Sequence, residues 1–488
     1  MSNENHSNSN RAAHTSDGHE DRRIATDGGS DERRKLGAQA SSSFRLAATG
    51  DAIVTRPLTP YEGTSDRFDR LLGLLREADA SVTNLEVLVH DYEPSPAANS
   101  GGTYMRASPR VLNDLTEAGI DLFSAATNHT LDYGRGGIER TLEALRKRNL
   151  TFAGLGDTLY EARRPGYLET SAGRIGMVSA CTSYTAGSEA GEQNAAMGGR
   201  PGLNPLGVER VHQISPDRMD ELRRVSEAAG IETIKQDWLD RGLYFGHDWD
   251  DDSYFHFGDM KFRAAEEGEQ GVEFIADGDD VAALTEWVDD ANSNADYVIA
   301  TIHTHQGVGG RQTTTETPEF LKRAARECVD AGADAVVCTG PHVLRGIEVH
   351  RHSPIFYSLG NFVVQNETVA RLPPESFERY GLDDPTKVSD VFDARLYAED
   401  GEPKGDLAND RFWETVVPIC VFDAEDGLAE IELHPCTLQQ SATRPQRGIP
   451  VLARDDEASH ILSDIADLSE PFGTEIEIAD GVGVVEFE

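Results

Sequence analysis

The feature that most constrains the fold is a recurring pattern, in which a short apolar run ends on side chains able to bind a metal ion or carry a proton. The clearest example is Asp121 to Gly134, where the run Leu122 to Ala126 is followed by Asn128-His129 and Asp132. Its length and composition favour a buried strand that leads into a helix. In open α/β sheets, ligands bind at the carboxyl ends of the strands. Taken alone, this segment fits equally well a polar loop with a solvated histidine.

Four more apolar runs end in the same way, on Asp51, on Glu86, on the pair His303 and His305, and on His342. Helices are predicted between most of these strands, because leucines and other apolar residues recur at helical spacing in Ser65 to Ala78, Gly137 to Arg148 and Asp279 to Asn292. Strands separated by helices favour a largely parallel arrangement, whose carboxyl ends gather along one edge. That edge would carry a pair of carboxylates, an amide oxygen and several imidazoles.

Two of these positions have structural alternatives. Gly50 is expected to let the backbone turn sharply after the strand Phe44 to Thr49, leaving Asp51 at the edge of the sheet, although Asp51 could simply cap a turn. Alternation along a strand puts His303 and His305 on one face. One of these histidines could be structural, but two on one face beside a glycine favour a site.

A donor set of nitrogen and oxygen without thiolate suits Mn, Fe or Zn better than Ca, with Mg possible through the oxygens. One carboxylate bridging two ions about 3.5 to 4 Å apart would suit hydrolysis of a phosphoryl ester, because the ions lower the pKa of bound water and take charge from the leaving oxygen. One or two ions are therefore expected. No Walker A loop, GxSxG elbow or HExxH helix is present. The five cysteines are odd in number and show no CxxC spacing, so neither a disulfide framework nor a cysteine zinc site is expected.

The charge balance is strongly acidic, with 86 acidic residues against 45 basic ones and a net charge of −41. Only seven of the basic residues are lysines, and this pattern resembles proteins of salt-loving organisms, whose cytoplasmic salt screens self-repulsion. A face for a basic partner would instead require acidic clustering, which is slight outside His247 to Asp252. Nucleic acid is not expected as a partner, because no basic stripe exists.

The chain is expected to divide into a disordered polar tail at 1–43, a main domain at 44–370 with an insertion at about 186–278, and an acidic C-terminal extension at 371–488 that completes the domain. The insertion gathers aromatic residues and is expected to pack on them as a lid, although His247 and His256 within it could be metal ligands. Neither a signal peptide nor an apolar run long enough for a membrane span is seen, so a cytoplasmic protein is expected.

Six motifs in order together resemble the CapA family, which is associated with capsule and poly-γ-glutamate biosynthesis and belongs to the calcineurin-like metallophosphatase superfamily. The resemblance extends from Phe44 to Val364. The motifs are Gly50-Asp51, Asn84-Leu85-Glu86, Asn128-His129 with Asp132-Tyr133-Gly134, Gly332-Ala333-Asp334, Pro341-His342-Val343-Leu344 with Gly346-Ile347-Glu348, and Tyr357-Ser358-Leu359-Gly360-Asn361-Phe362.

The resemblance implies an α/β fold of four layers, α-β-β-α, with two sheets packed together and helices outside. It also implies catalytic roles for His129, as the acid or electrophile beside the leaving group, and for Asp132. Five residues would occupy metal-ligand positions: Asp51, Glu86, Asn128, His305 and His342. Two positions depart from the superfamily pattern, because Ile53 and Thr339 stand where many relatives have histidines. A second ion may therefore be weakly held or absent, and His303 could compensate.

Candidate substrate-binding residues lie close in sequence to these loops. Arg56, Arg106 and Arg345 could each clamp an anionic group through a bidentate guanidinium, or could form ordinary surface ion pairs. His303 and Asn361 complete this group of candidates.

The expected function is that of a metal-dependent hydrolase, in which a metal-activated water attacks a phosphoester or a similarly anionic substrate and His129 assists departure of the leaving group. Two alternatives remain open. The first is a non-catalytic protein that binds or assembles poly-γ-glutamate or capsule material, which the imidazoles missing at Ile53 and Thr339 would favour. The second is a metal-dependent amide hydrolase that cuts γ-glutamyl links. The expected partner is in each case an anionic small molecule or a polymer of this type.

Overall fold

The structure, a computed structural model, describes residues 43–243, 249, 253–383, 387–425 and 427–487, all within the unit Ala40–Glu488. The polar tail expected at 1–43 lies outside the described residues except for Ser43, and so do His247 and Asp252. Within the described residues, no helix is both long and apolar enough to cross a membrane.

The first large sheet is built around β1, which pairs with β2 in parallel on one side and with β20 in antiparallel fashion on the other. Its order is β23-β24-β21-β20-β1-β2-β5-β6, with β19 also parallel to β1 and β22 paired with β21. The strands are β1 (Ser43–Ile53), β2 (Ala80–Asn84), β5 (Leu122–Ser124), β6 (Thr151–Ala153), β19 (Asn361–Val364), β20 (Glu414–Asp423), β21 (Gly427–Thr437), β22 (Val451–Leu452), β23 (Glu475–Ala479) and β24 (Val482–Glu486). The C-terminal region therefore supplies one side of this sheet.

The second large sheet has the order β17-β18-β16-β15-β9-β8. Its four central strands are parallel, and an antiparallel hairpin partner lies at each edge. The strands are β8 (Gly166–Thr170), β9 (Gly173–Cys181), β15 (Tyr297–His303), β16 (Ala335–Thr339), β17 (Leu344–His350) and β18 (Ser353–Leu359). The parallel arrangement expected from the alternation of strands and helices is thus confirmed for the centre of the second sheet and for β1, β2, β5 and β6 on one side of the first.

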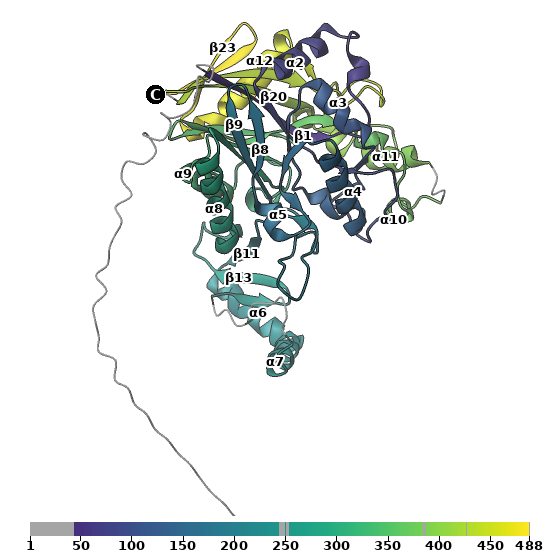
Figure 1. Cartoon of the computed structure of the whole chain (residues 1–488). Helices are drawn as coiled ribbons and strands as arrows, with labels where there is room; N and C mark the ends of the chain where they lie inside the picture. The colour runs from purple at the N-terminus through teal and green to yellow at the C-terminus, as the bar shows by residue number, and fades with distance from the viewer. Residues whose placement is uncertain (1–42, 244–248, 250–252, 384–386, 426, 488) are drawn as a thin grey trace, which may run out of the picture. The chain divides into compact units, whose positions relative to one another are not determined.

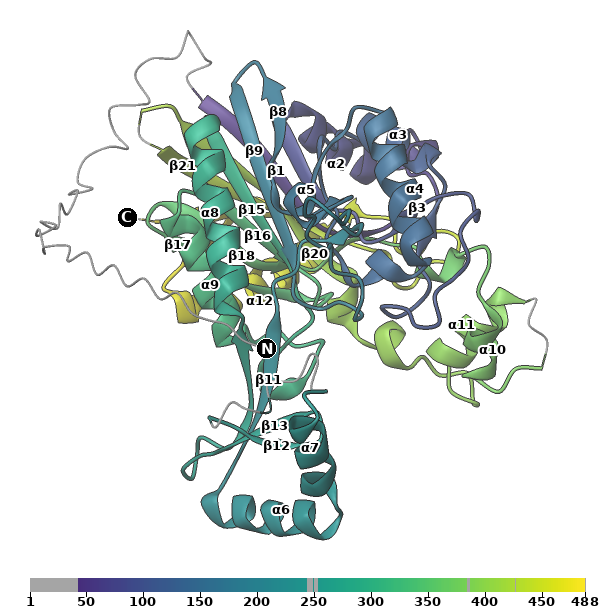
Figure 2. The ribbon, with the colours of Figure 1, turned by 60° about the horizontal axis from the view of Figure 1, so that its bottom comes forward.

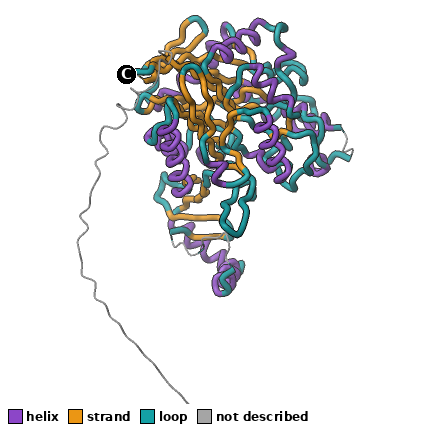
Figure 3. Tube along the Cα trace, in the orientation of Figure 1, coloured by secondary structure: helices purple, strands orange, loops and turns teal. Residues whose placement is uncertain are grey.

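Helices cover the outer faces of the two sheets, while apolar side chains fill the space between the sheets (Figures 1 and 2). Strand alternation explains this, since Phe44 and Leu46 of β1 face the second sheet and Ala47 faces the helices. The helices on the first sheet are α2 (Asp66–Glu77), α3 (Arg110–Ala118) and α4 (Gly134–Lys147), and those on the second are α8 (Gly278–Asn294) and α9 (Glu319–Asp330). Figure 3 shows the strands inside and the helices outside. The expected α-β-β-α sandwich is confirmed.

The insertion carries a smaller sheet of order β12-β13-β11-β14, which sequence reasoning did not predict. Its elements are β11 (Val208–Ile214), α6 (Pro216–Ala228), α7 (Ile231–Asp240), β12 (Phe255–Phe257), β13 (Met260–Ala264) and β14 (Gly271–Ala276). Ser215 caps α6 by accepting a hydrogen bond from the backbone N–H of Arg218, as the sequence Ser215-Pro216 favours.

The remaining elements connect these layers. Helix α12 (Asp455–Ser469) packs against β17 and β21 and so joins the C-terminal region to the second sheet. The short elements are β3 (Leu88–Val89), β4 (Arg106–Ala107), β7 (Leu155–Gly156), β10 (Gly202–Leu203), α5 (Leu159–Arg163), α10 (Pro374–Glu378), α11 (Val388–Leu396), η2 (Thr59–Tyr61), η3 (Asn128–Leu131), η4 (Val308–Gly310), η5 (Asn366–Thr368), η6 (Gly405–Ala408), η7 (Asp410–Trp413) and η8 (Glu470–Phe472).

One local expectation is wrong. The chain does not turn at Gly50, because β1 continues to Ile53. A Cβ atom at Gly50 would lie 2.0 Å from the carbonyl oxygen of Gly360, and the backbone N–H of Asp51 donates to that same oxygen at 3.0 Å. The glycine is therefore required by the close approach of a second backbone segment rather than by a turn.

Candidate metal centre

The first sheet contributes four side chains to one end of the sandwich. Asp51 lies near the end of β1, Glu86 lies two residues beyond β2, and Asn128 and His129 open η3 just after β5. A capping box fixes η3, since the backbone N–H of His129 donates to the side-chain oxygen of Thr127 at 3.2 Å. The local sequence thus sets the direction in which Asn128 and His129 leave the strand.

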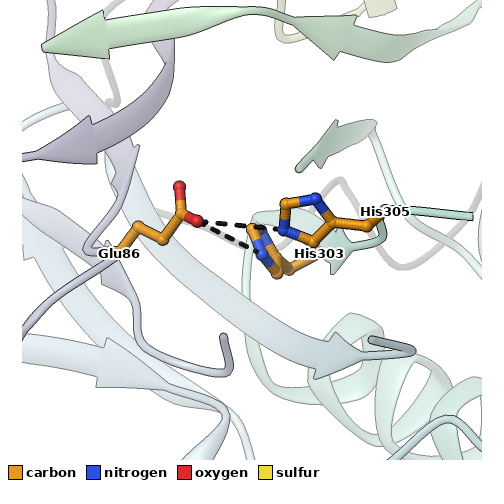
Figure 4. Close-up of side chains that lie close together, drawn as sticks. All are labelled: Glu86, His303 and His305. Atoms are coloured by element: carbon orange, nitrogen blue, oxygen red, sulfur yellow. Dashed lines mark ion pairs between the residues drawn. The ribbon is translucent and has the colours of Figure 1, made fainter. Parts of the chain in front are cut away.

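The second sheet contributes three imidazoles at the matching strand ends. His303 is the last residue of β15, His305 follows two residues later, and His342 follows β16. His342 has a φ of 58°, a left-handed backbone conformation that is uncommon for a residue other than glycine. Figure 4 shows His303 and His305 directed toward Glu86. Residues from both sheets therefore meet at one place.

The carboxylate of Glu86 lies at the centre of this meeting point. Its Oε1 atom lies 3.8 Å from the Nε2 atoms of His129, His303 and His342 and 3.9 Å from that of His305. Glu86 is 0% exposed, and among the described residues neither of its oxygens has a hydrogen-bond partner. These separations exceed hydrogen-bond length, but they match two ligands of one ion, since each metal–ligand bond is about 2 Å long.

Asp51 provides a second buried carboxylate beside Glu86. Its Oδ2 accepts a hydrogen bond from the backbone N–H of Gly340 at 2.9 Å, and its two oxygens lie 3.5 Å from the Nδ1 atoms of His303 and His342. Two ligand groups are found here, Asp51 with Glu86 and His342, and Glu86 with His303 and His305, each with its ligand atoms within 4.8 Å of one another. Glu86 belongs to both groups, as a bridging carboxylate would.

The electrostatics of the cluster favour a bound cation. Burial, and then the charge of Asp51, raise the pKa of Glu86 well above its usual range. Burial, and then His342 and His303, lower the pKa of His305 well below its usual range, so that its ring is neutral and has a free lone pair. Burial opposes protonation of His342, but the charges of Glu86 and Asp51 raise its pKa to about 9. A divalent cation would provide the positive charge needed to stabilise the ionised carboxylate of Glu86. The residues present therefore fit such an ion.

His129 and Asp132 form a separate unit at the edge of the cluster. The His129 Nδ1 atom lies 2.6 Å from Oδ2 of Asp132, and Asp132 is 0% exposed. Asp132 also accepts hydrogen bonds from the backbone N–H groups of Met105 at 2.7 Å and Gly101 at 2.9 Å. Asp132 therefore holds the imidazole from behind, and leaves Nε2 of His129 directed at the ligand cluster.

A cavity of about 640 Å³ opens onto this cluster. Four of the residues described above, Asn128, His129, His305 and His342, line it. The wall also includes residues of the insertion and of the C-terminal region, namely Val208, Arg210, Phe274, Arg395, Asp406 and Phe412. The volume is in the range of small-molecule sites and exceeds that of a single phosphate group.

Residues 45–366 match the family described as Bacterial capsule synthesis protein PGA_cap. The chain belongs to this family.

This PGA_cap chain is similar to two proteins in sequence and overlaps weakly with one solved structure. A protein of Sinorhizobium fredii named y4sH, described as uncharacterized, is 33% identical over 453 residues, which cover 91% of this chain and 93% of the relative. The Capsule biosynthesis protein CapA of Bacillus anthracis is 24% identical and covers 75% of this chain and 70% of its own. The resemblance to the CapA family is thus confirmed. The solved NAD nucleotidase NadN of Haemophilus influenzae covers 86% of this chain and 55% of its own, at 9% identity and a TM-score of 0.30, an overlap that supports no conclusion.

The predicted ligand residues of this PGA_cap protein lie close together, and His303 lies among them. Asn128 lies in the cluster through its Oδ1 atom, 3.0 Å from Nε2 of His303, while its amide nitrogen donates to the carbonyl of Gly101. His303, expected among the substrate-binding residues, lies within the ligand cluster. Thr339 contacts Nδ1 of His303 at 2.9 Å through its hydroxyl, and Ile53 lines the cavity with an apolar side chain.

Asn84 is a residue of the PGA_cap site that sequence reasoning did not assign. Its amide nitrogen contacts Asp51 Oδ1 at 2.8 Å and His303 Nδ1 at 3.1 Å, and its Oδ1 accepts a hydrogen bond from Ser124. It therefore orients one ligand from each sheet. Its place as the last residue of a strand, two positions before Glu86, was the signal that could have identified it.

The three arginines expected to bind substrate do not line the cavity of the PGA_cap site. Arg345 is 0% exposed and donates to the carbonyls of Gln306 at 3.1 Å and Thr314 at 3.0 Å, and burial lowers its pKa to about 10. Arg106 pairs with Asp91 at 2.7 Å, and Arg56 donates to the carbonyl of Pro445 at 2.7 Å. Their contacts are structural.

Asn361 orients His342, one of the candidate ligand residues. It is fully buried, with its Oδ1 atom 2.8 Å from Nδ1 of His342, and its amide nitrogen donates to the carbonyl of Phe412. The insertion histidine His256 is buried in β12 and is not among the residues that line the cavity.

Proposed function

We propose that this PGA_cap protein is a metal-dependent hydrolase of metallophosphatase type that acts on a phosphoester or another anionic substrate. The observation that carries the proposal is the Glu86 carboxylate, buried without a hydrogen-bond donor among the described residues and surrounded by four imidazoles. Without a cation, a charged carboxylate that is buried and unpaired would strongly destabilise the fold. A cation at this position removes that destabilisation.

The proposed ligands are Asp51, Glu86, Asn128, His305 and His342, with His303 added from the geometry. The donor set fits Mn, Fe or Zn, and Mg through the oxygens, as one or two ions. When bound, such an ion lowers the pKa of a water molecule and takes up negative charge on the substrate.

His129 is the proposed proton donor to the leaving group. Its Nδ1 atom is held by Asp132 at 2.6 Å, so the proton available for transfer is the one on Nε2. That atom lines the cavity side of the cluster, where a leaving oxygen would stand. Asp132 contributes the orientation of the ring.

The test is turnover by the purified full chain, loaded with Mn, Zn or Mg at high salt, against a panel of phosphoesters. We expect His129→Asn to lower kcat by about 10² to 10⁴-fold with its metal content unchanged, and Asp51→Asn to lower the metal content itself. His350→Asn, a change at a histidine that pairs with Asp330 and belongs to neither ligand group, serves as the control and should change neither. Turnover that is indifferent to both His129→Asn and Asp51→Asn would overturn the proposal.

A second candidate function is non-catalytic binding or assembly of poly-γ-glutamate or capsule material in the same cavity. It is favoured by the apolar side chain of Ile53 on the cavity wall and by the hydroxyl of Thr339, at positions where an imidazole would add a ligand. Binding of a γ-linked glutamate polymer without turnover of any phosphoester would support it. Release of glutamate from the same polymer would instead indicate a metal-dependent amide hydrolase.

A further inference from the structure

The cavity wall is basic, although the chain as a whole is strongly acidic. The residues that line it include Arg210, Arg311 and Arg395 but only one carboxylate, that of Asp406. The whole chain has 86 acidic residues against 45 basic ones. The local balance is therefore the reverse of the global one, and the cavity favours an anionic occupant.

The three guanidiniums differ in how far the protein already neutralises them. Arg395 donates to Asp406 and to the hydroxyl of Thr103, both at 2.8 Å. Arg311 is 70% exposed and lies 3.8 Å from Glu316. Arg210, in contrast, has no acidic partner among the residues that the structure describes, although acidic side chains are abundant. Among the described residues, Arg210 is thus the guanidinium on this wall without an acidic partner.

Strand pairing within the insertion fixes the position of Arg210. In the antiparallel β11–β14 pair, Arg210 stands directly opposite Phe274, and its guanidinium lies 5.6 Å from the centre of the Phe274 ring. The ring of Phe274 in turn contacts Phe320 of α9, with 6.2 Å between centroids. Val208 lies on the same face of β11 as Arg210, and it also lines the cavity. The aromatic ring therefore supports the guanidinium and connects it to a helix of the main sandwich.

We propose that Arg210, supported by Phe274, binds an anionic group of the substrate that lies away from the bond to be cleaved, so that the insertion selects substrates with at least two anionic groups. The inference rests on the proposed function only because both place the substrate in the same cavity. A guanidinium can bind either a carboxylate or a phosphate in bidentate fashion. At molar salt the Debye length is about 3 Å, so this selection depends on direct contact rather than on long-range attraction.

The test compares two ligands that differ only in the distal group. The probes are hexyl phosphate and 6-(phosphonooxy)hexanoate, with further arms that carry a terminal phosphate and spacers of increasing length. Binding to the Mn-loaded full chain is measured by calorimetry in a His129→Asn background, which prevents turnover. We expect the distal anion to tighten binding about tenfold at the best spacer length, and Arg210→Gln to abolish that gain while leaving hexyl phosphate within about twofold.

Two further variants separate contact from general charge. Arg210→Lys should retain part of the gain, because it keeps the charge but loses the planar fork. Arg218→Gln removes the same charge from α6 of the same insertion, where Arg218 pairs with Glu221 at 2.7 Å. This variant should retain the full gain in binding from the distal anion. Unchanged circular dichroism and Tm for each variant exclude misfolding as the cause.

An equal preference for the distal anion in wild type and Arg210→Gln, across all spacers and both distal groups, would overturn the inference. Loss of the preference in Arg210→Gln, together with no turnover of the phosphoester panel by the metal-loaded chain that retains His129, would sustain the inference and overturn the hydrolase. Preference in the carboxylate arm alone or in the phosphate arm alone would support the inference and identify the anion.

Discussion

At the residue scale, the decisive group is Glu86. A carboxylate that is fully buried and has no donor among the described residues is destabilising when charged, and burial raises its pKa well above the usual range. Glu86 is shared by two groups of residues that could hold a metal ion. Under the proposed function, cation binding would recover the free energy that the folded protein loses at Glu86.

The first prediction concerns Glu86→Gln. Removing the buried charge should leave the metal-free protein as stable as wild type, or more stable, and should abolish the increase in Tm that Mn produces. In wild type, Mn at about 100 times its Kd should add about 2.7 kcal/mol, which is an increase of several degrees in Tm. Thermal unfolding with and without Mn measures both effects.

Glu348→Gln provides the contrast for this experiment. Glu348 is a buried carboxylate that accepts hydrogen bonds from Tyr357 and Arg326 and belongs to neither ligand group. Its substitution should lower Tm equally with and without Mn. If Glu86→Gln behaves as Glu348→Gln does, Glu86 is a structural carboxylate and the metal centre is wrong.

The second prediction concerns Asp132→Asn. This substitution keeps the shape of the side chain but removes the charge that holds Nδ1 of His129, so we expect kcat to fall by about 10² to 10⁴-fold with little change in metal content. Asp330→Asn, which removes the partner of the surface histidine His350, should leave both kcat and metal content unchanged.

At the element scale, the loop between β15 and α9 carries His305 and depends on a buried arginine. The backbone N–H of His305 donates to the hydroxyl of Ser183 at 2.7 Å, and the guanidinium of Arg345 donates to the carbonyls of Gln306 and Thr314. Arg345 therefore holds the loop that carries His305 through its carbonyl groups.

The third prediction concerns Arg345→Met. The loop carbonyls would lose their buried donors, and we expect a loss of about 2 to 4 kcal/mol in unfolding free energy together with weaker Mn binding. Denaturant unfolding measures the first effect and a Mn titration measures the second, while hydrogen exchange across residues 306–314 reports on the loop. Arg351→Met, at an exposed arginine that pairs with Asp330, should change neither. Normal exchange in the loop of Arg345→Met would show that the loop is held by other contacts.

The elements that sequence reasoning identified best are those specified locally. The strands at Ala80–Asn84 and Tyr297–His303 are short β-branched or apolar runs with helices beside them, so their ends could be assigned to one edge. The role of Arg210 could not be predicted, because it arises from the pairing of β11 with β14, a contact distant in sequence. Gly50 was misread for the same reason, since the constraint comes from Gly360.

At the scale of the whole molecule, the net charge of −41 predicts strong dependence on salt. The Debye length falls from about 10 Å at 0.1 M salt to about 3 Å at 1 M, so added KCl should weaken the self-repulsion of the folded chain. The fourth prediction is that Tm rises by several degrees over this range. Sucrose, which favours burial without screening charge, should give a smaller rise at matched osmolality. Equal effects of KCl and sucrose would exclude screening as the cause.

The first sheet also shows that the C-terminal region is not structurally separate from the main domain. Strands β20 and β21 join the same sheet as β1, and β19 pairs with β1 in parallel. An acidic composition and frequent loops were the features that sequence reasoning could read there, while strand partners separated by most of the chain leave no local pattern.

The placement of β1 has a consequence for synthesis on the ribosome. Its N-terminal half pairs with β20, so this early strand waits for residues Glu414–Asp423 before one of its two sides is covered. Until then the nascent chain exposes an unpaired edge, which other chains can bind. Truncated products that stop before Glu414 should therefore aggregate or recruit chaperones, and slow translation of the last third of the message would prolong that exposure.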